Sequence, residues 1–130
     1  MLKVTAVEDK NEQSALCRRC ALPYLPRCLS YRADDGADFA GICQFYLDEK
    51  GGHLVSFAAV SPETAGDVLF LLGRTALNFM DLCGAEKAYF EGDGADPALL
   101  ARIGFRPGQD GRPALSLVGF FEHPCQHHTN

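Results

Sequence analysis

Four side chains near the two ends of the chain have the chemistry of zinc ligands. Cys17 and Cys20 form a CxxC pair, and Cys125 and His127 belong to a short tail rich in cysteine and histidine. Zinc favours four thiolate or imidazole ligands in a tetrahedron, so the two pairs together could fasten the tail to the first helix. Only one half of the usual paired motif is present, and cysteines three residues apart on a helix are equally explained by packing in the core. We therefore expect no metal and keep these four ligands as the alternative.

The amino-acid composition restricts the cellular compartment and the binding partners that can be expected for this protein. The 130 residues, 47% of them hydrophobic, fit one domain with a buried core. Residues 1–10 lack the continuous apolar segment of a signal peptide, and no later segment is apolar enough to span a bilayer. The cysteines are therefore expected to be reduced thiols in a cytoplasmic protein. The formal net charge of -5, without a basic block, predicts neither nucleic acid nor a membrane surface as a partner.

Hydrophobic periodicity and turn residues predict the elements that must position any site. The first half of the chain predicts, in order, a strand, a helix and three further strands, over residues 2–7, 11–22, 29–33, 39–47 and 53–60. Two short segments rich in Asp and Gly separate the last three strands and favour hairpin turns. These three strands are expected to form an antiparallel meander.

The second half opens with the most regular helix of the chain. Ser61 followed by Pro62 is typical of a helix start, and Thr64 with Asp67 offers a second capping box. Apolar residues then recur at helical spacing as far as Gly84, which is expected to end the helix.

A strand over 87–91, a short helix over 96–103 and a final strand over 114–121 complete the expected elements. The order β-α-β-β-β-α-β-α-β is typical of an α+β fold with a mixed sheet, in which an antiparallel meander precedes a β-α-β-α-β unit. We assign residues 1–122 to one domain and residues 123–130 to a C-terminal tail.

This order of elements resembles the GNAT superfamily of N-acetyltransferases, and two short motifs carry the resemblance. They are Gly84-Ala85-Glu86-Lys87-Ala88-Tyr89-Phe90 and Ala101-Arg102-Ile103-Gly104-Phe105-Arg106-Pro107. The resemblance implies that acetyl-CoA is the acetyl donor and binds in a V-shaped opening between the strands over 53–60 and 87–91. It also implies an amine as the acceptor and direct transfer without a metal.

In that family the pyrophosphate of the coenzyme lies at the N-terminus of the long helix, where N–H groups and the helix dipole bind an anion. The residues that the resemblance places around the coenzyme are Ala59, Val60, Thr64, Ala65, Gly66 and Asp67. The family motif is Gln or Arg, two residues, Gly, one residue, then Gly or Ala, and only Gly66 of it is kept. Glu63 and Asp67 instead place two carboxylates at the helix start, and Val68 adds bulk. A helix end satisfied by its own carboxylates is therefore the alternative to a pyrophosphate site.

Catalytic groups are less clearly marked. Many family members carry a tyrosine as general acid at the position of Leu100, but a thiolate is a good leaving group, so its loss does not exclude catalysis. Glu91, at the end of its strand, and His53, at the start of its strand, are the candidates for the base that takes a proton from the amine. An exposed strand end is the alternative interpretation of both residues.

Two functions follow from the sequence. The first is transfer of an acetyl group from acetyl-CoA to a small or protein amine. The second is a GNAT-fold domain that has lost coenzyme binding and acts as an interaction module, with a homodimer as one arrangement. The degenerate loop around Gly66 favours the second, and the preserved order of elements favours the first.

Overall fold

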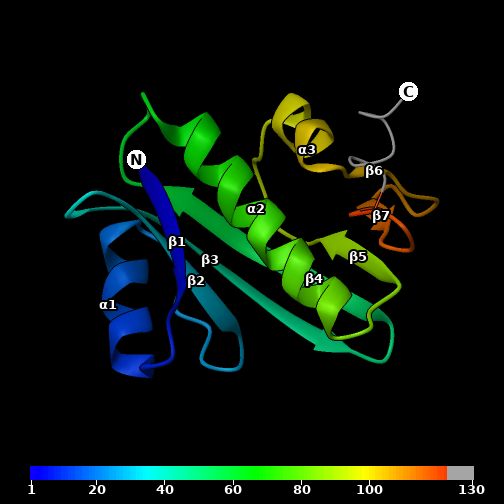
Figure 1. Ribbon diagram of the computed structural model, residues 1–130, viewed down its shortest axis with the longest axis horizontal. Helices are drawn as coiled ribbons and strands as arrows, with labels where there is room; N and C mark the ends of the chain where they lie inside the picture. Colours follow the sequence, from blue (N-terminus) through cyan, green and yellow to red (C-terminus); the bar gives the residue numbers. More distant parts are fainter. Residues whose placement is uncertain (123–130) are drawn as a thin grey trace.

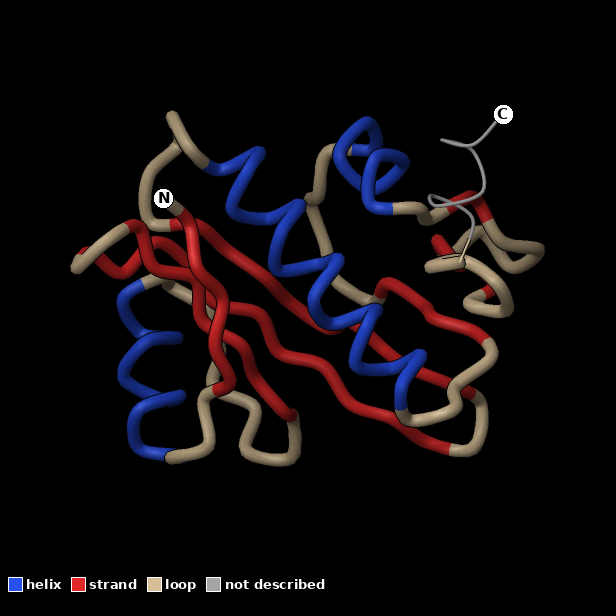
Figure 2. Tube along the Cα trace, viewed as in Figure 1, coloured by secondary structure: helices blue, strands red, loops and turns tan. Residues whose placement is uncertain are grey.

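A computed structural model describes residues 1–122 and contains one seven-stranded sheet (Figures 1 and 2). Its strands are β1 (Leu2–Ala6), β2 (Leu29–Asp35), β3 (Asp38–Asp48), β4 (Gly51–Ala59), β5 (Lys87–Phe90), β6 (Arg106–Pro107) and β7 (Pro113–Ser116). The order across the sheet is β1-β2-β3-β4-β5-β7-β6, and among the strand pairs of the described residues only β4 with β5 is parallel. The predicted meander and the mixed α+β sheet are confirmed.

Three helices in the described part of the chain cover the sheet: α1 (Lys10–Arg19), α2 (Ala65–Leu82) and α3 (Pro97–Ile103). In Figure 1, α2 runs diagonally across one face. Alternate residues of β3 divide between the two faces, because successive side chains of a strand point in opposite directions. Cys43 and Phe45 belong to the main core cluster beneath α2, whereas Ile42 packs in a smaller cluster with Leu16 and Cys17 of α1. Each face of β3 is therefore covered by its own helix.

The boundaries predicted for α1 are wrong at both ends. The helix begins at Lys10 because the Asp9 carboxylate caps it, accepting hydrogen bonds from the N–H groups of Asn11 and Glu12 at 2.7 and 3.3 Å. It ends at Arg19, before the predicted end at 22, because Ala21 adopts a left-handed conformation with φ 56°. The chain then runs irregularly to β2.

The predicted periodicity of α2 is confirmed, since Val68, Leu72, Ala76 and Met80 are fully buried against the sheet. Its predicted start at Ser61 is wrong. The helix begins at Ala65, and the Ser61 hydroxyl donates a hydrogen bond to the Glu63 carboxylate instead of capping the helix.

The last predicted strand, 114–121, is too long. β7 covers only Pro113–Ser116, because the chain turns at Gly119, which has φ 72°, and the N–H of Phe120 donates to the carbonyl of Leu117 at 3.1 Å. The edge strand β6 was not predicted, since two residues carry no periodic signal.

At Gly41 the helix α2 lies close against the meander. A Cβ atom at this position would lie 2.6 Å from Val68 Cγ1 and 2.7 Å from the backbone oxygen of Ala58. We expect Gly41→Ala to lower the free energy of unfolding by about 1–3 kcal/mol, because the backbone must shift to make room. Gly66→Ala is the matched control, since nothing lies within 4 Å of a Cβ there. Urea unfolding of both variants checks the prediction, which fails if they lose the same stability.

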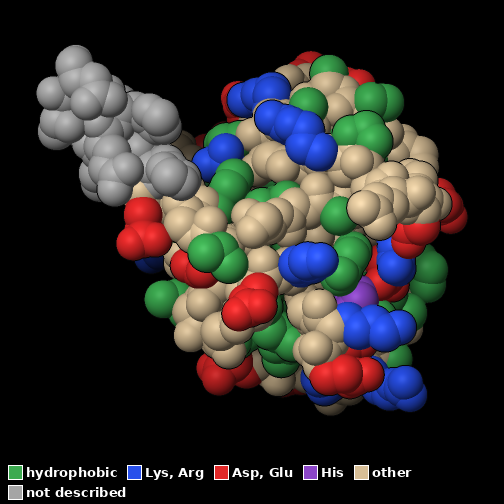
Figure 3. Space-filling model, turned by 90° about the vertical axis from the view of Figure 1, so that its right-hand side faces the viewer, with side chains coloured by type: hydrophobic (Ala, Val, Ile, Leu, Met, Phe, Trp, Pro, Cys, Tyr) green, Lys and Arg blue, Asp and Glu red, His purple; other side chains and the backbone are tan. Residues whose placement is uncertain are grey.

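On the face shown in Figure 3, acidic and basic side chains are interspersed and no block of one sign forms. No helix within residues 1–122 is both long and apolar enough to cross a membrane.

Candidate functional site

The two parallel strands at the centre of the sheet separate after a short paired segment. β4 and β5 are in register from Gly52 to Leu54, and the N–H of Glu91 donates to the Leu54 carbonyl at 2.8 Å. At the same place β4 is irregular on its other side, because Gln44 pairs with Ser56 while Phe45 pairs with Leu54. Val55 is thus the extra residue of a β-bulge, which bends a strand. The bend opens the sheet between β4 and the segment that follows β5, as the V-shaped opening requires.

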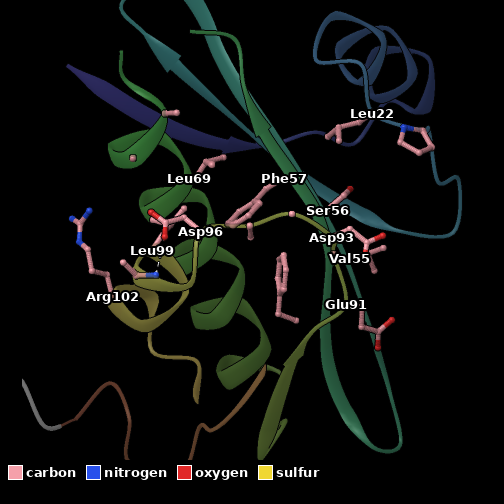
Figure 4. Close-up of a pocket in the computed structure, with 18 of the residues that line it drawn as sticks. Leu22, Val55, Ser56, Phe57, Leu69, Glu91, Asp93, Asp96, Leu99 and Arg102 are labelled. Atoms are coloured by element: carbon pink, nitrogen blue, oxygen red, sulfur yellow. Dashed lines mark hydrogen bonds between the residues drawn. The ribbon is translucent and has the colours of Figure 1, made fainter. Parts of the chain in front are cut away.

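A cavity of about 710 Å³ occupies this opening. In Figure 4, Leu69, Leu99 and Arg102 lie on the side of α2 and α3, whereas Leu22 and Glu91 lie on the other side of β4. The cavity therefore connects the two faces of the sheet. A ligand on one face can reach a group on the other face through it.

The N-terminus of α2 borders the first of these two sides, where Ala65 and Gly66 line the cavity. Thr64 occupies the N-cap position, but its side chain makes no capping hydrogen bond, so the predicted capping box is wrong. Glu63 is held by Ser61, and its carboxylate does not cap the helix. Within residues 1–122 no carboxylate accepts a hydrogen bond from this helix end, contrary to the interpretation that its own carboxylates satisfy it. The N–H of Ala65 donates to the Pro62 carbonyl at 3.4 Å, whereas the N–H groups of Gly66 and Asp67 are available to an anion.

The charges around this helix end remain mixed. Hydrogen bonding from Ser61 keeps the pKa of Glu63 below its ordinary value, so this exposed residue is an anion at neutral pH. Asp67 is exposed in the first turn of the helix. Arg102 of α3 lines the same cavity and is a cation. The sequence did not predict its presence here, because Arg102 is far from Gly66 along the chain. Ala59 ends β4 and Val60, 46% exposed, follows it, but neither residue lines the cavity.

The two candidate bases meet on the other side of the opening. His53 lies beside Tyr89 across the parallel register, and its Nδ1 contacts Oε2 of Glu91. His53 is only 3% exposed, so the alternative of an exposed strand end is wrong for this residue. The side chain of Glu91 is 23% exposed and lines the cavity. Residues that are 38 positions apart thus form one polar cluster.

A third acidic residue completes the cluster. Nε2 of His53 lies 2.8 Å from Oδ1 of Asp48, and the ring is stacked between those of Tyr46 and Tyr89 at 4.5 and 5.3 Å. A neutral imidazole donates from one nitrogen only, so two carboxylate contacts require either a charged ring or a proton on one carboxyl group. Hydrogen bonding to His53 lowers the pKa of Asp48. The ring holds Glu91 in one orientation from within the sheet.

The other contacts of Glu91 leave one oxygen more open. Arg112 donates to Oε2 at 3.3 Å, and its guanidinium stacks on the ring of Tyr89. Burial and the adjacent carboxylate raise the pKa of Tyr46, whose hydroxyl lies 3.4 Å from both Glu91 oxygens. Oε1 has only this long contact among the described residues. It is the oxygen free to take a proton from a ligand in the cavity.

The remaining predicted groups do not join this cluster. Leu100 is buried on α3 at 8% exposure and supplies no proton. Cys17 is buried, and burial raises the pKa of its thiol to about 11, while Cys20 is half-buried at the end of α1. Cys125 and His127 lie outside the described residues. Within residues 1–122 no group of His, Cys, Asp or Glu side chains has the arrangement of a metal site.

Comparison with known proteins gives a match in structure but not in sequence. No protein-family model matches the chain, and no curated protein has a significant sequence match. An IAA acetyltransferase from Bacillus cereus superposes with a TM-score of 0.71 at 18% identity, covering 89% of this chain and 99% of that one. A Bacillus subtilis acetyltransferase in complex with CoA gives 0.67 at 18% identity, with the same coverages.

A GNAT family acetyltransferase from Brucella melitensis in complex with acetyl-CoA also gives a TM-score of 0.67, at 13% identity, covering 89% of this chain and 88% of that one. Identities this low establish the fold and leave the activity open. The chain therefore has the fold of the GNAT N-acetyltransferases, a mixed sheet of seven strands opened between β4 and β5.

Proposed function

We propose that this protein transfers an acetyl group from acetyl-CoA to a primary amine. The observation that carries the proposal is the cavity through the sheet, which joins an uncapped helix N-terminus on one face to the Glu91 carboxylate on the other. Several structures of the same fold contain CoA or acetyl-CoA.

The α2 side of the cavity fits the pyrophosphate of the donor. Gly66 leaves open space where a side chain would stand. The N–H groups of the first turn, which no side chain caps, lie at the positive end of the helix dipole. Ala65 keeps the surface beside them small, and Arg102 supplies positive charge to the same cavity. When bound, acetyl-CoA supplies a thioester carbonyl that an amine can attack.

The opposite side of the cavity fits the acceptor. A primary amine is an ammonium ion at neutral pH, so it loses one proton to solvent before the attack and a second proton during it. Oε1 of Glu91 is placed to take the proton that the nitrogen loses as it bonds to the acetyl carbon. His53 and Arg112 hold the other oxygen and so fix the orientation of the base. Solvent protonates the departing thiolate, because Leu100 has no proton to give.

The two carboxylates at the start of α2 favour the second candidate, a GNAT-fold module that no longer binds coenzyme. Glu63 and Asp67 lie where the phosphates of a coenzyme would carry negative charge, and like charges repel. The uncapped N–H groups and Arg102 act in the opposite direction. Repulsion by the carboxylates and attraction by the N–H groups and Arg102 act on the same coenzyme, so the affinity for acetyl-CoA measures the balance between them.

Removing the two charges is expected to strengthen coenzyme binding. The double variant Glu63→Gln and Asp67→Asn should bind acetyl-CoA about threefold to tenfold more tightly than the wild type at low salt. The gain should shrink as salt screens the charges. Asp81→Asn with Glu86→Gln, near the other end of α2, changes the net charge equally and is the control. Equal affinity of the two double variants would refute the electrostatic argument.

The activity itself is tested by release of free CoA. The full chain is incubated with acetyl-CoA and a panel of primary amines, and acetylated product is identified by mass spectrometry. Product that depends on the amine supports acetyl transfer. No product with any amine, together with no binding of the coenzyme, would instead favour the interaction module.

A further inference from the structure

One wall of the cavity is an irregular segment between α1 and β2. Leu22, Pro23 and Leu25 of this segment line the cavity, and in Figure 4 Leu22 lies on the same side of β4 as Glu91. We call these three residues the acceptor wall. The wall belongs to no helix or strand, so its position depends on the side chains that tie it down.

A buried amide makes that connection. Gln44 of β3 is fully buried, and its Nε2 donates to the carbonyl of Pro23 at 2.9 Å and to the Ser56 hydroxyl at 3.0 Å. Its Oε1 accepts hydrogen bonds from the N–H of Leu25 and from Nε2 of Gln13, both at 2.9 Å. The amide has two donors and room for two acceptor bonds, and all four are used.

Gln13 strengthens the same connection from α1. It is also fully buried, and its Nε2 lies 3.3 Å from the carbonyl of Leu25. The wall is therefore bonded through its backbone to α1 and β3, and through Gln44 to Ser56 of β4. Ser56 follows the bulged residue Val55, where the opening begins. One network thus fixes the distance between the wall and the opening.

The chemistry of the two sides of this space differs. The wall presents apolar side chains, whereas Glu91 and Asp93, which line the same cavity, carry carboxylates. A cationic nitrogen suits the carboxylates, an apolar body suits the wall, and a further carboxylate on the ligand would be repelled.

We propose that Gln44 is a positioning residue for the acceptor, holding the acceptor wall against β4 so that the cavity takes a primary amine with an apolar, uncharged body. The inference rests on the proposed function, because the amine bound there is the acceptor of that reaction.

Leucinamide and leucine are the matched probes, since they share the amine and the apolar body and differ in the carboxylate. Each is titrated calorimetrically into the full chain, alone and saturated with CoA, which carries no acetyl group to transfer. Leucinamide should bind at least about tenfold more tightly than leucine in one of the two states. Equal affinities, or no binding of leucinamide in either state, would overturn the substrate class.

Two variants test the role of Gln44. Gln44→Leu leaves the backbone of the wall without its partners and should weaken leucinamide binding about tenfold, with the affinity for CoA unchanged. If that variant does not fold, Leu22→Ser removes apolar surface from the wall outside the network and should act in the same direction. Leu82→Ser, at a site that is 76% exposed on α2, is the control.

The outcomes separate this inference from the proposed function. Loss of amine binding with intact CoA binding supports the positioning role, whereas unchanged leucinamide affinity in the folded variants overturns it. A third outcome is that CoA does not bind, leucinamide binds more tightly than leucine, and Gln44→Leu weakens leucinamide binding. The proposal of acetyl transfer would then be refuted, and the proposal of an amine site would be supported.

Discussion

Replacing Glu91 with glutamine is expected to lower kcat for acetyl transfer by about two to four orders of magnitude, the usual contribution of a general base. The amide keeps the shape of the side chain but cannot take a proton from the acceptor. The affinity for acetyl-CoA should not change, because Glu91 lies on the opposite side of β4 from the start of α2. Initial rates of CoA release and a calorimetric titration measure the two effects separately.

Glu86→Gln is the control for this experiment, since Glu86 is exposed just before β5 and its loss changes the net charge equally. A Glu91→Gln enzyme with wild-type kcat would show that Glu91 is not the base. Its partners would then have a structural role, because Asp48 and His53 reach the cavity only through Glu91.

Replacing Gly66 with phenylalanine should weaken acetyl-CoA binding by about two orders of magnitude. The side chain would fill the space that the pyrophosphate needs and deny it the uncapped N–H groups of α2. Two charge-assisted hydrogen bonds of about 1.5 kcal/mol each account for a change of this size. The protein should still unfold cooperatively, because nothing lies within 4 Å of a Cβ at this position.

Asn78→Phe is the matched control, since Asn78 is exposed on the same helix and does not line the cavity. Thermal unfolding with and without acetyl-CoA measures both the cooperativity of unfolding and the stabilisation by the coenzyme for each variant. Unchanged binding by the Gly66 variant would mean that the coenzyme is not held by the start of α2.

The sequence predicted the elements well where a long periodic pattern existed. The apolar spacing of α2 has this property: Val68, Leu72, Ala76 and Met80 are buried, although Phe79 is half-buried and Cys83, at the end of the pattern, is exposed. Short elements were less well predicted. The apolar run that ends at Phe121 looked like a strand, but Gly119 turns the chain before the end of the run. Ser61 and Pro62 looked like a helix start, but the serine hydroxyl bonds to Glu63.

The candidate site was harder to predict because its groups meet through the tertiary structure. Glu91 and His53 were identified one by one, yet only the parallel register of β4 and β5 brings them together. Asp48 was interpreted as part of a hairpin turn, and Gln44 gave no signal, since a polar residue in a strand is usually exposed. Their roles depend on the bulge in β4 and on the path of the wall after α1, which no local pattern contains.

Calorimetric titration of the full chain with acetyl-CoA at low salt tests the central claim most directly. The uncapped start of α2, the open space at Gly66 and Arg102 predict saturable binding with one site per chain. An affinity in the micromolar range would match the account and support the search for the acceptor. No heat and no thermal stabilisation at millimolar coenzyme would contradict it, and the protein would then be a GNAT-shaped domain with another ligand.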